Sequence, residues 1–161
     1  MTISCQRIRY DNQATVTNER FDHKLNRLLN FSVPTLSVEQ LHDIQGEVYI
    51  FDTRKEEEFL ISHLPEARFM EYPQLDTNSL QGISFQDTIV LYCSVGYRSE
   101  RIGEKLKKLG YQQVFNLYGS IFEWANCDYP LIDSAGQPTK KVHTYNRRWS
   151  KWVNDQNRKI W

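Results

Sequence analysis

Cysteine is scarce in this chain of 161 residues, which contains only Cys5, Cys93 and Cys127. An odd and sparse set of this kind argues against a disulfide framework, so free thiols are expected. Long apolar runs are absent as well, because none approaches the roughly 20 residues that a transmembrane helix needs. Neither charge is in excess, since 20 basic residues stand against 20 acidic ones. No transmembrane segment and no nucleic-acid partner are therefore expected.

The start of the chain lacks the charged and apolar regions of a secretory signal peptide. This lack favours a cytoplasmic protein. One alternative stays open, because residues 2–5 (Thr-Ile-Ser-Cys) also fit the end of a trimmed lipoprotein signal. Cys5 would then be a lipidation site, and the protein would be periplasmic or lipid-anchored.

Metal and cofactor motifs are also missing. There is no Cys-x2-Cys pair, and the four histidines are scattered along the chain. The glycines, including Gly103 and Gly110, do not form a phosphate-binding loop. No metal and no cofactor are expected.

Apolar spacing and capping signals predict three helices. Residues 21–29 carry Phe and Leu at i, i+4, i+7 and i+8, which predicts a helix that ends before Pro34. Residues 37–40 (Ser-Val-Glu-Gln) form a capping box at the start of a second helix. A third helix is predicted over residues 99–109, with Gly110 as its stop signal.

Three continuous runs of β-forming residues predict strands buried on both faces, at residues 48–51, 89–92 and 114–117. Strands and helices that alternate with short connections indicate an α/β domain with a mainly parallel sheet. We predict three parts: an N-terminal arm and helix (1–34), the α/β domain (35–131), and a C-terminal extension (132–161).

Cys93 stands at the position where chemistry is expected, directly after the strand at 89–92 and before a helix. Ligand sites in open α/β sheets lie beyond the carboxyl ends of the strands. Backbone N–H groups and the positive end of the helix dipole favour a thiolate there, and so does Arg98. Gly96 permits a tight turn, and Ser94 and Val95 leave the cradle open. A merely buried strand-end cysteine is the alternative, but this context favours an activated nucleophile.

Four segments, in the same order, resemble signatures of the single-domain rhodanese-like sulfurtransferases over roughly residues 35–131. Residues 93–99 (Cys-Ser-Val-Gly-Tyr-Arg-Ser) resemble the active-site loop of that family. The other three are residues 51–59, similar to its Asp-x-Arg strand end and acidic helix; residues 62–67 (Ser-His-Leu-Pro-Glu-Ala), similar to its Gly-His-Ile-Pro-Gly-Ala turn; and residues 109–124, similar to its closing strand and helix start.

Two positions depart from the family pattern. Ser120 replaces the second glycine of the closing motif, and we expect it to cap the following helix. Glu66 stands where the family commonly has glycine. Neither change touches Cys93 or Arg98.

The resemblance implies a three-layer α/β fold, with a central sheet flanked by helices, and ping-pong sulfur transfer. Cys93 would carry the sulfur as a persulfide, taken from a small anionic donor such as thiosulfate and passed to a thiol, cyanide or protein acceptor. Arg98 would either bind the anionic group of the donor or brace the loop. The N–H groups of the loop would hold the persulfide and the departing anion; the loop residues concerned are Ser94, Val95, Gly96, Tyr97 and Ser99.

Two rival functions are weighed. Cysteine phosphatases and arsenate reductases on the same fold generally have five residues between Cys and Arg, whereas only four separate Cys93 from Arg98. The smaller loop favours one bound sulfur over a phosphoryl group. A non-catalytic rhodanese-like module is the other rival, and the intact Cys93 loop argues against it without excluding a persulfide carrier.

Four further residues are interpreted as mainly structural. Asp52 and Arg54 are expected to form an ion pair that anchors a strand end, although their position also allows a functional role. His63 is expected to be structural, because a preformed thiolate hardly needs a base. Cys127 could resolve a persulfide as a disulfide with Cys93, but an inert buried thiol is favoured.

The C-terminal extension is basic and aromatic. Residues 131–161 carry seven Lys/Arg and two acidic residues, with three of the four tryptophans. Helical spacing of Tyr145, Trp149, Trp152 and Val153 predicts an amphipathic helix. It could anchor to anionic lipid or nucleic acid, but the acidic remainder of the chain favours packing on the body. There it would overhang the Cys93 pocket and narrow the range of acceptors.

Overall fold

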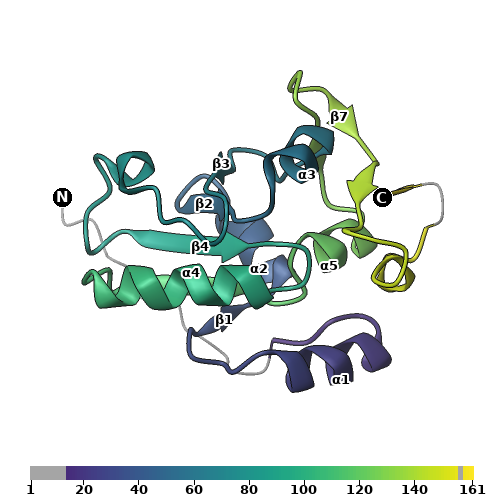
Figure 1. The fold of residues 1–161 in the computed structure, drawn as a ribbon, viewed down its shortest axis with the longest axis horizontal. Helices are drawn as coiled ribbons and strands as arrows, with labels where there is room; N and C mark the ends of the chain where they lie inside the picture. Colours follow the sequence, from purple (N-terminus) through teal and green to yellow (C-terminus); the bar gives the residue numbers. More distant parts are fainter. Residues whose placement is uncertain (1–13, 156–157) are drawn as a thin grey trace.

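A computed structural model describes residues 14–155 and 158–161 (Figure 1). Its centre is a five-stranded sheet in which all paired strands run parallel, in the order β1-β5-β4-β2-β3. The mainly parallel α/β sheet predicted from the sequence is confirmed. The strands are β1 (Thr35–Leu36), β2 (Tyr49–Asp52), β3 (Arg68–Phe69), β4 (Thr88–Tyr92) and β5 (Gln113–Leu117).

Helices cover both faces of this sheet, which explains why the central strands are apolar at successive positions. Side chains alternate between the two faces of a strand. Val90 and Phe115 enter one apolar cluster, whereas Leu91 and Val114 enter the other. The first cluster includes side chains of α1 (Glu19–Leu28), α2 (Val38–Ile44) and α5 (Ser120–Asn126), and the second includes side chains of α4 (Tyr97–Lys108). Two shorter helical segments are α3 (Glu56–Ile61) and the 3-10 helix η1 (Thr77–Leu80).

The helix starts lie close to their predicted places. Ser37 and Gln40 form the predicted reciprocal capping box of α2. α4 begins at Tyr97, two residues earlier than expected, because Gly96 with its φ of +113° serves as the N-cap. Arg98 therefore lies in the first turn of α4.

The C-terminal extension does not form the predicted helix. It consists of β6 (Leu131–Ile132), β7 (Pro138–Thr139), β8 (Val142–His143), the 3-10 helix η2 (Ser150–Trp152) and β9 (Lys159–Ile160). Where the helix was expected, the Asn146 side chain accepts the N–H groups of Arg148 and Trp149 at 3.0 and 3.1 Å. Tyr145 has a positive φ of 66°. The prediction was wrong because apolar spacing does not register a side chain that competes for backbone hydrogen bonds.

The extension nevertheless lies against the body of the protein. Val153 is buried in the cluster formed by α1, α2 and α5. The ring of Trp152 stacks on Phe21 of α1, with the centroids 5.2 Å apart. Arg158 donates to the Ala125 carbonyl at 2.5 Å. These contacts place the basic extension next to the N-terminal helix and α5.

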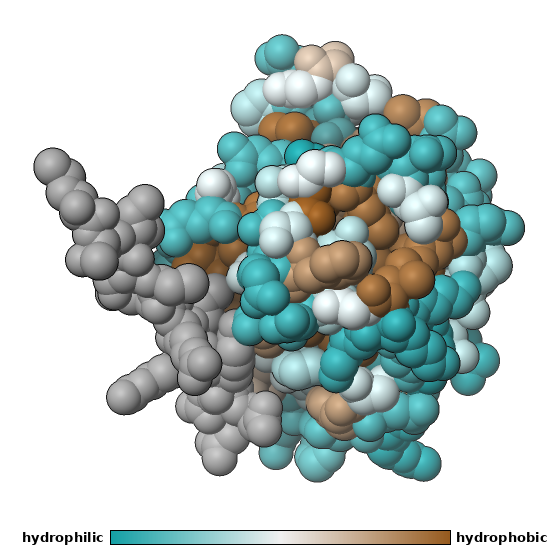
Figure 2. All heavy atoms as spheres, turned by 90° about the vertical axis from the view of Figure 1, so that its left-hand side faces the viewer, coloured by the Kyte–Doolittle hydropathy of each residue, from teal (hydrophilic) through white to brown (hydrophobic). Residues whose placement is uncertain are grey.

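The end of the sheet where the strands begin has an apolar surface without reactive side chains in its hollow. Apolar side chains reach the exterior there (Figure 2). Phe85 and Leu109 are among the exposed large apolar residues and, with Leu80 and Tyr111, line a hollow of about 220 Å³. No acid, amine or thiol side chain is among the residues that line it. The candidate chemistry is therefore at the opposite end.

Cys5 lies outside the described residues, so the lipidation alternative is not addressed by the structure. Among residues 14–155 and 158–161, no helix is both long and apolar enough to cross a bilayer.

Candidate active site

Cys93 is the first residue after β4, and its side chain is almost fully buried. The chain turns at Gly96, whose left-handed backbone carries no steric penalty in glycine. α4 then begins at Tyr97. The structure thus places the Cys93 sulfur at the junction of a strand and a helix.

Most carbonyl groups of this loop point away from the Cys93 sulfur and accept hydrogen bonds from neighbouring elements. Three of them accept hydrogen bonds from β5 and α5. The Cys93 and Ser94 carbonyls accept the N–H groups of Ile121 (3.2 Å) and Phe122 (3.3 Å), and the Gly96 carbonyl accepts Asn116 Nδ2 (3.0 Å). On the inner side, the Gly96 N–H donates to Cys93 Sγ at 3.1 Å. The loop therefore offers N–H donors to the sulfur, an arrangement that suits an anion.

The environment lowers the pKa of the Cys93 thiol below the ordinary value. Burial by itself would raise it, because a thiolate is poorly solvated in the protein interior. The positive charge of Arg98 and hydrogen bonds from the N–H groups of Ser99, Val95 and Gly96 outweigh that effect. Cys93 therefore has the surroundings that lower the pKa of reactive cysteines.

Arg98 is held by a carboxylate that the sequence analysis did not single out. Its Nη1 and Nη2 donate to the two oxygens of Glu58 at 2.7 and 3.0 Å, and Nη2 also donates to Ser94 Oγ at 2.9 Å. Ser94 Oγ in turn donates to Glu58 at 3.2 Å. Both ends of the guanidinium are engaged, and this geometry favours the bracing role for Arg98.

Glu58 is buried, yet its pKa lies below the ordinary value. Burial would raise it, but the hydrogen bonds and charge of Arg98 and the Lys55 N–H outweigh burial. The sequence showed Glu58 only as the last of three glutamates at a helix start, a pattern typical of a solvated first turn. No signal in the sequence distinguishes it from Glu56 and Glu57.

Ser120 has a different role from the predicted cap. Gly119 is the N-cap of α5, and Ser120 itself has a positive φ of 53°. Its hydroxyl accepts the Cys93 N–H at 3.2 Å and donates to the Leu117 carbonyl at 3.1 Å. The side chain is turned toward the Cys93 loop, so the capping prediction was wrong. Glu66, the other position that departs from the family pattern, also has a positive φ, of 64°.

Asn116 is a second loop-bracing residue that the sequence analysis missed. It lies in β5 and is fully buried. Its amide donates to the Gly96 carbonyl, and its carbonyl oxygen accepts the Ser99 hydroxyl at 2.7 Å. A buried asparagine inside an apolar strand run was the available signal, because such a group requires partners.

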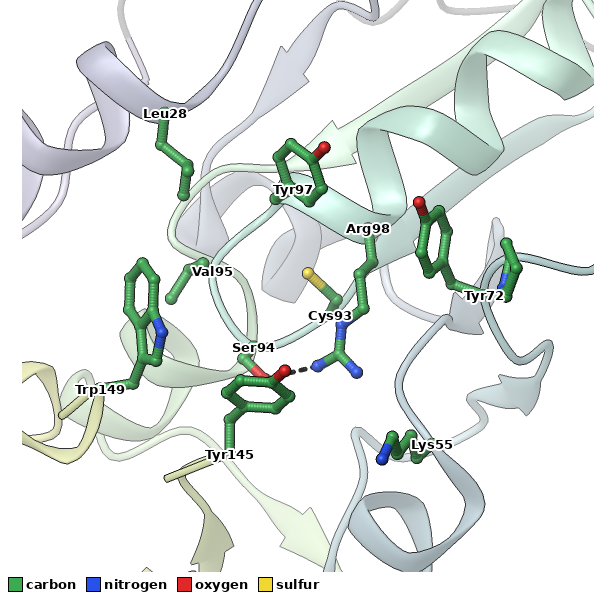
Figure 3. Close-up of a pocket in the computed structure, with 11 residues that line it drawn as sticks. Leu28, Lys55, Tyr72, Cys93, Ser94, Val95, Tyr97, Arg98, Tyr145 and Trp149 are labelled. Atoms are coloured by element: carbon green, nitrogen blue, oxygen red, sulfur yellow. Dashed lines mark hydrogen bonds between the residues drawn. The ribbon is translucent and has the colours of Figure 1, made fainter. Parts of the chain in front are cut away.

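A cavity of about 560 Å³ opens onto the loop. The Cys93 sulfur is directed into it, whereas the Arg98 guanidinium is turned toward Ser94 and Tyr145 (Figure 3). The Arg98 guanidinium lies 5.4 Å from the centroid of the Tyr145 ring. The lining residues are Leu28, Lys55, Tyr72, Pro73, Cys93, Ser94, Val95, Tyr97, Arg98, Tyr145 and Trp149.

Asp52, Arg54 and His63 do not line this cavity. Arg54 is fully buried, donates to both Asp52 oxygens, and bonds the Ser62 carbonyl at 2.6 Å. His63 stacks on Phe59, with the centroids 3.9 Å apart. These contacts tie the end of β2 and the segment after α3 to their neighbours, and the structural role of Asp52, Arg54 and His63 stays a prediction.

Cys127 does not line the cavity either. Burial raises the pKa of its thiol to about 12, together with the charges of Glu123 and Glu39. Within the described part of the chain, no cluster of three His, Cys, Asp or Glu side chains is arranged to hold a metal ion.

Comparisons with known proteins agree with the fold. The family model of the rhodanese-like domain matches residues 37–127, more than half of the chain. A protein named sulfurtransferase from Allochromatium vinosum is 30% identical over 91 residues, which cover 56% of this chain and 83% of that relative. A tRNA uridine(34) hydroxylase from Bartonella bacilliformis is 27% identical over 84 residues, covering 48% of this chain and only 28% of that relative.

A solved structure shows the same fold. The crystal structure of the BH2092 protein from Bacillus halodurans superposes with a TM-score of 0.58 at 19% identity. The match covers 74% of this chain and 88% of that one. The resemblance drawn from the sequence motifs is confirmed at the level of family and fold.

Proposed function

Because this chain belongs to the rhodanese-like domain family, we propose that it is a sulfurtransferase that carries sulfane sulfur as a persulfide on Cys93. The observation that carries the proposal is the Cys93 sulfur, which faces a cavity and accepts a loop N–H while its thiol pKa is lowered. A thiolate in such a loop is both a nucleophile and a carrier of an anionic sulfur chain.

In the first half-reaction, the Cys93 thiolate attacks the outer sulfur of thiosulfate or a similar small anionic donor. A bond forms between Cys93 Sγ and that sulfur, and the S–S bond of the donor breaks. The electron pair of the broken bond leaves with sulfite. Cys93 then holds the transferred sulfur as a persulfide anion, without any external oxidant.

In the second half-reaction, a thiolate or cyanide attacks the outer sulfur of the persulfide. The bond to Cys93 Sγ breaks, and its electron pair restores the thiolate. A thiol acceptor leaves as a persulfide, and cyanide leaves as thiocyanate. The N–H groups of Val95, Gly96 and Ser99 stabilise the negative charge on Cys93 in the resting state between turnovers.

Arg98 affects Cys93 through its positive charge and through its position in the loop, without binding the donor. Both of its terminal nitrogens are bonded to Glu58, so the anionic group of a donor meets loop N–H groups instead of a free guanidinium. Its positive charge still lowers the pKa of Cys93. Arg98 is therefore a positioning residue that also tunes the nucleophile.

The rival functions have less support. A phosphatase needs a general acid for its leaving group, and no carboxylic acid is among the described residues that line the cavity. A purely non-catalytic module would need no activated thiol. A persulfide carrier with a dedicated partner shares the first half-reaction, and only turnover distinguishes it from an enzyme.

The test is thiocyanate formation from thiosulfate and cyanide, with mass spectrometry of the protein after thiosulfate alone. We expect turnover and a mass gain of one sulfur in the wild type, and neither in Cys93→Ser. Cys127→Ser is the matched control, because it removes a thiol that does not line the cavity, and it should keep both signals. Turnover that survives Cys93→Ser would reject the proposal, and sulfur uptake without turnover would favour the carrier.

A further inference from the structure

Part of the cavity wall comes from outside the segment that matches the family. Leu28 belongs to α1, and Tyr145 and Trp149 belong to the C-terminal extension. All three lie beyond residues 37–127. The matched segment supplies the reactive loop, and these added side chains supply apolar surface beside it (Figure 3).

The cavity is much larger than the small ions of the reaction require. A volume of about 560 Å³ is in the range of pockets that bind small organic molecules. Seven of the eleven lining residues are aliphatic or aromatic: Leu28, Tyr72, Pro73, Val95, Tyr97, Tyr145 and Trp149. Contact of this apolar surface with sulfite or cyanide contributes no hydrophobic free energy. Contact with an apolar ligand does, because apolar area on both sides is removed from water.

Two polar side chains of the wall, Arg98 and Ser94, are already paired. Arg98 and Ser94 share hydrogen bonds with Glu58. Lys55 is more exposed, and its ammonium pairs only loosely with a carboxylate oxygen of Glu57, 3.7 Å away. The guanidinium nearest Cys93 is therefore not free to recognise a second substrate by its charge.

The added wall is held in place before any ligand arrives. Lys24 lies over the Trp149 ring at 5.5 Å, and Arg98 lies over the Tyr145 ring at 5.4 Å. The next aromatic residue of the extension, Trp152, stacks on Phe21. A preformed wall loses little conformational entropy when it binds a ligand, which favours selectivity.

We propose that the sulfur acceptor is a small organic thiol with an apolar body of about the size of an aromatic ring. Leu28, Tyr145 and Trp149 are the residues that select it. The inference rests on the proposed sulfur transfer, because the acceptor thiolate attacks the outer sulfur of the Cys93 persulfide. The product is the persulfide of the organic thiol, and Cys93 returns to the thiolate.

The experiment isolates the second half-reaction. Purified full-length protein is loaded with sulfur from thiosulfate and freed of excess donor. It is then mixed with phenylmethanethiol, with 2-mercaptoethanol, or with cyanide, and loss of the added sulfur is followed by mass spectrometry. The two thiols have similar acidity, so a difference in rate reports the apolar body and not the concentration of thiolate.

We expect the wild-type persulfide to react about tenfold faster with phenylmethanethiol than with 2-mercaptoethanol, from burial of one ring. Trp149→Ala should remove most of that preference, and Trp149→Phe should restore part of it. Trp161→Ala is the matched control, because this tryptophan is also in the extension but is 60% exposed and does not line the cavity. It should keep the full preference.

Equal rates with the two thiols in the wild type overturn the inference, whatever the variants do. A preference that persists unchanged in Trp149→Ala overturns the assignment of the selecting wall. Rapid discharge by cyanide with slow discharge by both thiols also rejects it, and points to a protein acceptor. Failure to load sulfur on Cys93 rejects the proposed function itself, and this inference with it.

Discussion

The two thiols in the described part of this protein have opposite surroundings. Burial raises the pKa of both. At Cys93, the charge of Arg98 and several loop N–H groups more than reverse that effect. At Cys127, the carboxylates of Glu123 and Glu39 lie 3.7 and 3.9 Å from the sulfur and add to it, so that the pKa rises to about 12.

The comparison separates burial from reactivity. Cys93 is the more completely buried of the two, yet its thiol is the more acidic. The sign of the neighbouring charge and the direction of the nearby backbone dipoles decide the difference. The predictions below measure this difference directly or change a charged group that contributes to it.

The largest effect is expected from Arg98→Met, which removes the cation beside Cys93. The thiol pKa should rise toward that of an ordinary buried cysteine, and sulfur uptake from thiosulfate at pH 7 should fall about a hundredfold. The pH dependence of alkylation at Cys93 measures the pKa, and stopped-flow mass analysis measures the uptake. The midpoint of alkylation should move to higher pH.

Arg98→Lys is the matched control, because it keeps the charge but cannot bond both Glu58 oxygens in a fork. A smaller loss, about tenfold, is expected. If Lys and Met variants are equally impaired with an unshifted alkylation midpoint, geometry alone matters and the electrostatic account fails.

The wild-type protein allows the comparison to be measured directly. The lowered thiol pKa of Cys93 and the raised thiol pKa of Cys127 favour the Cys93 thiolate at neutral pH, an advantage partly offset by the higher intrinsic nucleophilicity of the more basic sulfur. We expect a small alkylating agent to modify Cys93 at least about thirtyfold faster than Cys127. Peptide mapping after timed alkylation gives both rates, and equal rates contradict the prediction.

Glu58→Gln tests the brace behind Arg98. Because the carboxyl pKa of Glu58 is lowered in the folded protein, the ion pair stabilises the fold above the unfolded-state pKa, and this stabilisation is lost as pH falls through the lower, folded value. We expect the variant to lose about 2 kcal/mol of unfolding free energy at neutral pH.

Urea unfolding of both proteins at neutral pH and at about pH 3 measures this loss, and the difference should shrink at the acidic pH. Glu57→Gln is the control, because its carboxylate is exposed and pairs only loosely with Lys55. A difference between Glu58→Gln and wild type that is the same at both pH values would rule out the ionised carboxylate as its cause.

The smallest effect is expected at Cys127. Glu39→Gln removes one of the two charges that raise the pKa of this thiol, while burial and Glu123 remain. Alkylation of Cys127 should become about threefold faster, as expected for one partly solvated charge. Alkylation of Cys93 in the same sample serves as the internal reference, and its rate should not change.

A large part of the fold, and the position of Cys93 at the centre of the candidate site, could be predicted from local sequence. The runs that became β2, β4 and β5 are apolar at successive positions because both faces are covered, and this property is visible in the sequence. Cys93 follows one such run directly, so its place at a strand end was also visible. The capping box of α2 was read correctly for the same reason, since its partners are three residues apart.

Contacts between distant segments were not visible. Glu58 and Arg98 are forty residues apart, and nothing in the acidic run marked which glutamate would be buried. The hydroxyl of Ser120, which follows β5, accepts the N–H of Cys93 at the end of the neighbouring strand β4, 27 residues away along the chain. In the extension, helical spacing gave the wrong secondary structure, because Asn146 and packing against α1 decide its path.

The sequence by itself determined the three central strands, the helices α1, α2 and α4, the place of Cys93 at a strand end, and the basic character of the C-terminal extension, since each depends on neighbours along the chain. The extension was also expected beside the Cys93 pocket, and Tyr145 and Trp149 do line it. Tertiary structure alone decided that Arg98 is braced by Glu58 and that Cys127 lies between carboxylates. The physical reason is that charge and apolar contact act through space, and the fold brings together groups that the chain keeps far apart.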